Sequence, residues 1–162
     1  MKILLLLRHG KSSWDDPALR DFDRPLKKRG IKAALRIGKF MREREVRPDL
    51  VLCSPAKRAA QTAELVWKSA HLDCELRYEK RLYAASAAAM RDVLSEEGAN
   101  VVLLVGHNPG LQELVQYLTG EFKEIPTAAL ARIVLEVESW SELREQSGRL
   151  DWLVLPKSLG KG

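Results

Sequence analysis

Ile3-Leu4-Leu5-Leu6-Leu7 runs directly into Arg8-His9-Gly10 near the N-terminus. An uninterrupted apolar run of this length, closed by polar residues and glycine, is typical of a strand buried in a parallel sheet. A second such run, Val101-Val102-Leu103-Leu104-Val105, leads into Gly106-His107-Asn108. Ligands of open α/β sheets bind in the crevice beyond the carboxyl ends of the strands. If the two strands are neighbours, both histidines face that crevice.

Strand-like and helix-like segments alternate along the rest of the chain, which is typical of an α/β sheet with helices on its faces. We expect further strands at 50–53 and 75–78, and helices at 25–44, from Ser54-Pro55 to 70, at 86–97 and at 111–118. Two late segments, 133–137 and 150–154, alternate apolar and polar residues, which predicts half-exposed antiparallel strands at the sheet edge. The predicted fold is an α/β, three-layer α/β/α sandwich with a mainly parallel sheet and an antiparallel edge.

A length of 162 residues favours one domain with a sizeable core. We assign residues 1–156 to this single domain and 157–162 to a flexible C-terminal tail. No apolar stretch approaches the roughly 18–20 residues that span a bilayer, and the first apolar run is too short for the core of a signal peptide. A cytoplasmic protein without a membrane partner is therefore predicted. The spacings of Cys53, Cys74 and the histidines describe no zinc site, so no metal is expected.

Lys and Arg outnumber Asp and Glu by 27 to 22, which gives a formal net charge of +5. Such an excess suits an anionic substrate, a nucleic acid or merely a soluble surface. Aromatic residues make up 6% of the chain and are not interleaved with the charges, so the stacking platform of a single-strand nucleic-acid binder is missing. Most basic residues of one cluster are expected to form the solvated face of a helix. The cluster consists of Arg24, Lys27, Lys28, Arg29, Lys32, Arg36 and Lys39.

Four residues lie where a predicted strand passes into a loop or helix at one edge of the sheet. They are Arg8, His9, Arg58 and His107. Together with the amides of two helix N-termini, they form a dense cluster of donors for an anion. Arginine grips phosphoryl oxygens bidentately, and a neutral imidazole is a nucleophile toward phosphorus. One histidine must be neutral to attack while the other stays protonated as a donor, so we expect the crowded cations to push their pKa values apart.

Four stretches of the chain resemble the histidine phosphatase superfamily, also called the phosphoglycerate mutase-like fold. They are Leu7-Arg8-His9-Gly10, Asp23-Arg24-Pro25-Leu26-Lys27-Lys28-Arg29-Gly30, Ser54-Pro55-Ala56-Lys57-Arg58-Ala59-Ala60-Gln61-Thr62-Ala63 and Gly106-His107-Asn108-Pro109-Gly110-Leu111. The second stretch, together with the short chain, resembles the SixA branch of small phosphohistidine phosphatases in particular. An RHG triplet alone is a weak signal, but its combination with SPxxRxxQTA and GHNPG is specific.

The resemblance implies a metal-independent phosphatase without a cofactor, in which His9 is the nucleophile that becomes transiently phosphorylated. The phosphoryl oxygens would be held by Arg8, Arg58 and His107, with help from the backbone amide of Asn108. Further candidate substrate contacts are Gly10, Lys11, Ser12 and Asn108. Lys11 and Ser12 follow the nucleophile closely and could instead cap a turn.

One departure from the superfamily pattern narrows the substrate. Larger members carry an acidic residue that protonates the leaving oxygen, and here the comparable stretch 81–86 has Ala84 in its place. An alkoxide leaving group needs such a general acid, whereas an imidazole leaves more easily. The segment from this stretch to the strand at 101–105 is also too short for the substrate-capping insertion of the larger members. Both departures favour a P–N bond as the substrate and an open site that admits a protein.

The predicted function is therefore hydrolysis of phosphohistidine on a protein, either a phosphocarrier or a phosphorelay domain, through a covalent phosphohistidine on His9. Two alternatives stay open: a small-molecule phosphomonoesterase of the same fold, and a catalytically idle module that binds a phosphorylated ligand. Both histidines and both arginines are retained, which speaks against the idle module. A mutase is disfavoured because a chain this short has no lid to retain an intermediate.

Overall fold

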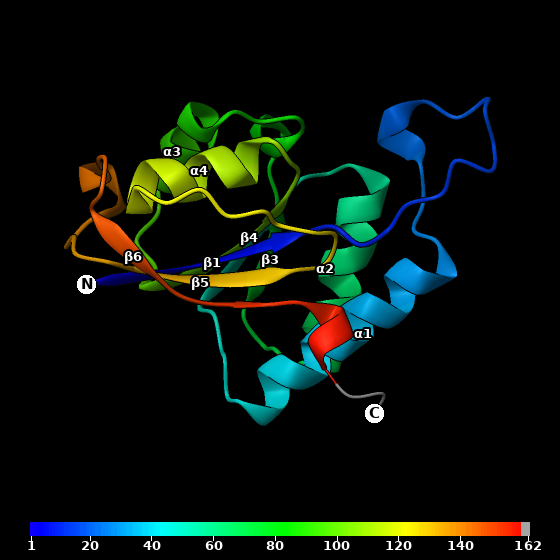
Figure 1. Cartoon of the computed structure of the whole chain (residues 1–162), viewed down its shortest axis with the longest axis horizontal. Helices are drawn as coiled ribbons and strands as arrows, with labels where there is room; N and C mark the ends of the chain where they lie inside the picture. Colours follow the sequence, from blue (N-terminus) through cyan, green and yellow to red (C-terminus); the bar gives the residue numbers. More distant parts are fainter. Residues whose placement is uncertain (160–162) are drawn as a thin grey trace.

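The computed structural model describes residues 1–159 and contains a six-stranded sheet between helices (Figure 1). The strands are β1 (Lys2–Arg8), β2 (Leu50–Cys53), β3 (Glu75–Tyr78), β4 (Val101–Gly106), β5 (Leu130–Leu135) and β6 (Gly148–Val154). Their order across the sheet is β3-β2-β4-β1-β5-β6. The first four strands are parallel, whereas β5 is antiparallel to β1 and β6 is antiparallel to β5. The predicted mainly parallel sheet with an antiparallel edge is confirmed.

The two strands that carry the histidines are direct neighbours. β1 pairs with β4 in register, and Arg8 lies opposite Gly106. The backbone N–H of His9 donates to the Gly106 carbonyl at 3.2 Å, so the pairing continues past the strand end. His9 and His107 therefore follow adjacent strands at the same edge, where an open α/β sheet binds its ligands.

Each face of the sheet is covered by a pair of helices, because successive side chains of a strand point to opposite faces. The helices are α1 (Lys28–Glu43), α2 (Lys57–Ser69), α3 (Ala87–Leu94) and α4 (Gly110–Thr119). On β1, Leu4 and Leu6 pack in the core formed with α3 and α4, whereas Leu5 and Leu7 pack in the core formed with α1 and α2. Figure 1 shows α3 and α4 above the sheet and α1 below it. The predicted three-layer sandwich is confirmed.

The start of α2 differs from the prediction. We expected Ser54-Pro55 to open the helix, with Ser54 as its cap. The helix begins only at Lys57, and Ala56 at the N-cap position provides no side-chain hydrogen bond. The Ser54 hydroxyl accepts from the Ala56 N–H at 3.3 Å in the preceding turn. The expectation failed because this hydroxyl also lies 2.7 Å from His107 Nε2. Ser54 therefore forms a hydrogen bond with the histidine and does not cap the helix.

The antiparallel strands and the C-terminal segment also differ in detail. β5 is almost fully buried because it lies between β1 and β6, and only β6 has the predicted half-exposed pattern. After β6, the 3-10 helix η4 (Pro156–Ser158) packs against α1. The predicted tail thus overlaps η4, its residues 160–162 lie outside the described residues, and the domain boundary at 156 stays a prediction. No helix in residues 1–159 is both long and apolar enough to cross a membrane.

Candidate active site

The four residues singled out by strand-end position gather in one cavity of about 310 Å³. Arg8 ends β1 and His9 follows it. Arg58 lies in the first turn of α2, and His107 directly follows β4. The remaining lining residues are Lys11, Ser12, Trp14, Arg24, Asn108 and Thr127. The cavity therefore has a basic lining, and no Asp or Glu of the described residues contributes to it.

The ring of His9 is held in one orientation by its own loop. Its Nδ1 lies 2.8 Å from the Gly10 carbonyl oxygen, which can only accept, so Nδ1 carries the proton of the neutral ring. The lone pair is then on Nε2, which lies 3.4 Å from Nε of Arg58. Since His9 is only 7% exposed, this orientation is enforced by the surrounding protein. A nucleophilic histidine attacks through an unprotonated nitrogen, and in His9 that nitrogen is Nε2.

The backbone of Gly10 supports this orientation of His9. Its N–H donates to Thr62 Oγ1 at 2.9 Å, while its carbonyl faces His9. A Cβ at Gly10 would lie 2.9 Å from the Gly30 carbonyl oxygen, so only glycine lets the loop pass α1 this closely. Both polar groups of Gly10 are occupied, and it does not line the cavity. A contact between Gly10 and the substrate stays a prediction.

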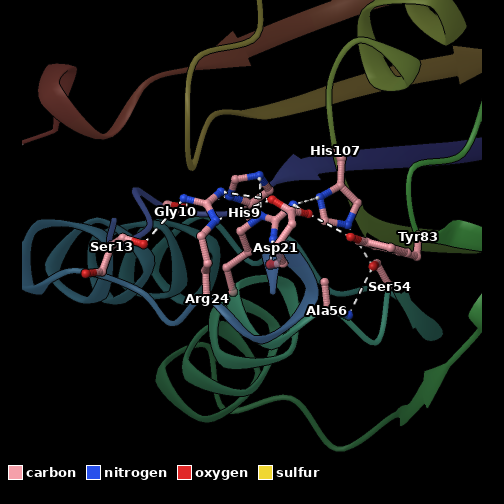
Figure 2. Close-up of polar contacts among 10 residues, drawn as sticks. His9, Gly10, Ser13, Asp21, Arg24, Ser54, Ala56, Tyr83 and His107 are labelled. Atoms are coloured by element: carbon pink, nitrogen blue, oxygen red, sulfur yellow. Dashed lines mark hydrogen bonds and ion pairs between the residues drawn. The ribbon is translucent and has the colours of Figure 1, made fainter. Parts of the chain in front are cut away.

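His107 is oriented by a different set of partners. Its Nδ1 lies 3.5 Å from Nη2 of Arg58, and a guanidinium group can only donate. Nδ1 therefore holds the lone pair, and Nε2 donates its proton to Ser54 Oγ at 2.7 Å. The ring centroids of His9 and His107 are 5.1 Å apart. Two imidazole nitrogens without protons thus converge on the same guanidinium group (Figure 2).

Both imidazoles have lowered pKa values. Burial is the main cause for His9, whose pKa falls to about 4, and nearby arginines contribute. Burial also lowers the pKa of His107 to about 3, and His9 and Arg58 add to the effect. We predicted one neutral and one protonated ring, but both are neutral near pH 7 in the protein alone. A bound phosphoryl dianion would favour protonation of His107, since an opposite charge stabilises the charged form.

These pKa values make the folded protein sensitive to mild acid. Above pH 6.5 both rings are neutral in the folded and the unfolded chain, and they add no pH dependence. Below pH 6.5 both histidines become protonated in the unfolded chain. In the folded chain His9 stays neutral down to about pH 4 and His107 down to about pH 3. The free energy of unfolding therefore falls as the pH falls. We expect a loss of up to about 2 kcal/mol for each histidine between pH 6.5 and 5.

Urea unfolding at pH 6.5 and pH 5 measures this loss. The His107→Gln variant should lose less stability on acidification than the wild type, because one of the two rings is gone. The matched control is His71→Gln, which replaces an exposed imidazole and should follow the wild type. The same pH dependence in all three proteins would contradict the lowered pKa values.

Arg58 is buried and connects both histidines to the long loop that follows β1. Its Nη1 donates to the Asp21 carbonyl at 2.7 Å, and its Nη2 donates to Asp21 Oδ2 at 3.0 Å. The Tyr83 hydroxyl donates to the same carboxylate at 2.7 Å. That hydrogen bond is the main reason that the pKa of Asp21 lies below its usual range, and Arg58 adds to it. Asp21 is therefore ionised at neutral pH and accepts hydrogen bonds rather than supplying a proton.

Arg8 and Asn108 leave donors available for a ligand. Nη1 of Arg8 donates to the Ile125 carbonyl at 3.1 Å, but its buried Nε has no partner within residues 1–159. Burial and the neighbouring Arg58 lower the pKa of Arg8. The Asn108 side chain is used internally, since its Nδ2 donates to the same Ile125 carbonyl at 2.8 Å. Its backbone N–H makes no hydrogen bond in the described part of the chain and stays a candidate substrate contact.

Sequence reasoning missed three residues of this site and misplaced a fourth. Asp21 and Tyr83 hold Arg58 and the His107 side of the cavity, and the Tyr83 ring lies edge-on to His107 at 5.7 Å. Ser54 orients His107. Arg24, which we counted among the solvated cations, is buried beside Asp21 and stacks on Trp14 with 3.4 Å from its guanidinium carbon to the ring centroid. Ala84, at the position of the missing acid, is exposed and lies outside the cavity lining.

Metal ligands are not clustered in this part of the molecule. Within residues 1–159, no group of three or more His, Cys, Asp or Glu side chains is arranged to hold a metal ion. Asp21 is engaged by Arg58 and Tyr83. The polar side chains that line the cavity carry guanidinium, imidazole, ammonium, hydroxyl and amide groups.

Comparison with known proteins finds relatives along nearly the whole chain. A family model described as the histidine phosphatase superfamily, branch 1, matches residues 4–84. An uncharacterized chloroplastic protein of Arabidopsis thaliana is 31% identical over 172 residues, which cover 96% of this chain and 78% of the relative.

Two solved structures have the same fold over almost their entire length. The proposed phosphohistidine phosphatase SixA from Agrobacterium tumefaciens superposes with a TM-score of 0.83 at 29% identity, covering 96% of this chain and 98% of that one. The protein histidine phosphatase SixA in complex with tungstate superposes with a TM-score of 0.82 at 26% identity, with the same coverage of 96% and 98%.

Proposed function

The chain belongs to the histidine phosphatase superfamily, and from that premise we propose that it is a phosphohistidine phosphatase. It would hydrolyse the P–N bond of a phosphorylated protein through a covalent phosphohistidine on His9. The observation that carries this proposal is the orientation of His9, whose Nδ1 is bonded to the Gly10 carbonyl while its unprotonated Nε2 faces Arg58. The similarity to SixA structures supports the choice of substrate.

In the first step, Nε2 of His9 attacks the phosphorus of the substrate phosphohistidine. The new P–Nε2 bond forms as the P–N bond of the substrate breaks, and its electron pair stays on the substrate imidazole. The substrate reacts with its ring protonated on the nitrogen that is not bonded to phosphorus, so the ring leaves as a neutral imidazole. Guanidinium donors stabilise the charge on the three transferring oxygens, and the unpartnered Nε of Arg8 is a buried donor that would supply this stabilisation.

In the second step, water attacks the phosphorylated His9. The water oxygen bonds to phosphorus, the electron pair of the P–Nε2 bond returns to Nε2, and both hydrogens of the water leave with the phosphate. Nδ1 keeps its proton and its bond to the Gly10 carbonyl throughout, so the neutral ring is restored in its starting tautomer. One nucleophile thus divides a single displacement into two easier ones.

The lack of a carboxylic acid that could act as general acid supports a P–N rather than a P–O bond in the substrate. Position 84 carries no acid, and Asp21 is held as an ionised acceptor by Tyr83 and Arg58. No Asp or Glu lines the cavity in the described residues. An alkoxide leaving group would need general-acid help, whereas an imidazole that departs neutral needs much less.

We expect the purified protein to dephosphorylate a phosphohistidine-bearing phosphocarrier faster than it hydrolyses any member of a panel of phosphomonoesters. Both reactions are run with excess EDTA, because the proposed mechanism uses no metal. Released phosphate is measured for each substrate. Loss of activity in EDTA would contradict the metal-independent mechanism.

The same assay separates the alternatives. Faster hydrolysis of phosphomonoesters would favour the small-molecule phosphomonoesterase, and binding without turnover of any substrate would favour the idle module. The cytoplasmic location and the identity of the phosphorylated partner stay predictions, and the Arabidopsis relative is chloroplastic.

A further inference from the structure

A second cavity, of about 380 Å³, adjoins the catalytic cavity, since Lys11 and Thr127 line both. We refer to it as the basic groove, which is defined by its cationic residues Lys11, Arg29, Lys32, Arg36 and Lys157. No Asp or Glu of residues 1–159 lines the groove. None of its five cations forms an ion pair with a carboxylate in that part of the chain.

Most of the basic groove lies on one face of α1. Arg29, Lys32 and Arg36 are spaced by three and four residues, so their side chains share a face of the helix. At 1.5 Å per residue, this row extends about 10 Å along the helix axis. Lys157 stands on the opposite wall because η4 lies against α1, as Figure 1 shows at its red end. The groove therefore leads from the loop of the nucleophile out along α1.

The basic residues on this face of α1 do not stabilise the helix. Its first turn contains no acidic residue, and Lys27 at the N-cap position makes no side-chain cap. Basic side chains such as Lys28 and Arg29 repel the positive end of the helix dipole. Like charges three and four residues apart are also destabilising. The folded protein thus keeps an uncompensated positive field beside the catalytic cavity, which an anionic partner would relieve.

We propose that the basic groove docks an acidic segment of the phosphoprotein substrate. Carboxylates near the phosphohistidine would lie along Arg29, Lys32 and Arg36 while the phosphoryl group enters the catalytic cavity. This proposal rests on the proposed function. A row of cations along a helix suits an extended chain of carboxylates, and no aromatic side chain lines the groove in the described residues to stack nucleic-acid bases.

The test compares two synthetic peptides of equal length, each with one phosphohistidine flanked either by glutamates or by glutamines. Phosphoramidate, which has a P–N bond but no peptide, measures the basal reaction. We expect kcat/KM for the glutamate peptide to be roughly tenfold higher than for the glutamine peptide, because several exposed ion pairs contribute modestly each. The advantage should shrink as salt is added, since exposed charges are screened.

The variant Lys32→Glu/Arg36→Glu should remove the advantage of the glutamate peptide and leave phosphoramidate hydrolysis unchanged. Lys68→Glu is the matched control, because Lys68 is exposed on α2 and lies outside the groove. It should behave as the wild type with both peptides. Equal kcat/KM for the two peptides in the wild type, or an equal loss in the control, would overturn the docking surface.

A binding measurement separates failure of the docking surface from failure of the proposed function. Fluorescence anisotropy follows a labelled, unphosphorylated glutamate peptide on wild type and on Lys32→Glu/Arg36→Glu. If no phosphohistidine substrate is hydrolysed but this peptide binds the wild type and not the variant, the docking surface stands and the phosphatase proposal fails. If the peptide does not bind while an oligouridylate binds through the same two residues, the groove is a nucleic-acid site and the proposal is wrong.

Discussion

Replacing His9 by Ala is expected to reduce phosphohistidine hydrolysis by on the order of 10⁴-fold or more, because removal of the nucleophile leaves only binding and charge stabilisation. The other histidine of the cavity lining, His107, does not present the same ring atom. His107 turns the lone pair of its Nδ1 toward Arg58, and its Nε2 is engaged by Ser54. Phosphate release from a phosphohistidine-bearing protein measures the loss.

The control for this prediction is His71→Ala, which removes an exposed histidine far from the cavity lining. It should keep wild-type activity. Circular dichroism of His9→Ala shows whether the fold is intact, since His9 is a buried residue. Substantial turnover by a folded His9→Ala protein would move the nucleophile elsewhere.

Arg58→Lys should lower kcat by about 10²–10³-fold, the range found when one preorganised donor to a developing charge is removed. Lysine keeps the positive charge but lacks the planar fork. Arg58 uses that fork to reach His9, His107 and two oxygens of Asp21, the backbone carbonyl and Oδ2, at once. A single ammonium group cannot make these contacts together, so both imidazoles and the loop after β1 would lose a common anchor.

Steady-state kinetics with the phosphohistidine protein test this second prediction. The loss should fall mainly on kcat, because the fork stabilises charge that develops during transfer. Lys57→Ala removes the exposed cation next to Arg58 and should leave the kinetics unchanged. If Arg58→Lys retained wild-type kcat, positive charge alone would be sufficient and the role of the fork would be wrong.

The position of the site could be predicted from the sequence because it depends on strand ends. The apolar runs before His9 and His107 each predict a buried parallel strand. In the structure these two runs form β1 and β4, which pair with Arg8 opposite Gly106. The position of Arg58 could be predicted in the same way, because α2 begins at the carboxyl end of β2, which lies at the same edge of the sheet.

The fine geometry could not be predicted because it depends on how a long loop folds back. Asp15, Asp16, Asp21 and Asp23 lie in one polar segment, and nothing local distinguishes among them. Only the tertiary path of the loop places Asp21 against Arg58 and Tyr83. The protonation state of His107 could not be predicted from the sequence either. Burial, which a sequence does not display, outweighs the expected tendency of one ring to stay charged.

The most direct measurement is to mix the protein with a phosphohistidine-bearing substrate, quench the reaction within a turnover and locate the phosphoryl group by mass spectrometry under non-acidic conditions. The account predicts one acid-labile phosphoryl group on His9, attached to Nε2, and no adduct in His9→Ala. A phosphoryl group on another residue, or turnover in which no covalent adduct can be trapped, would contradict it.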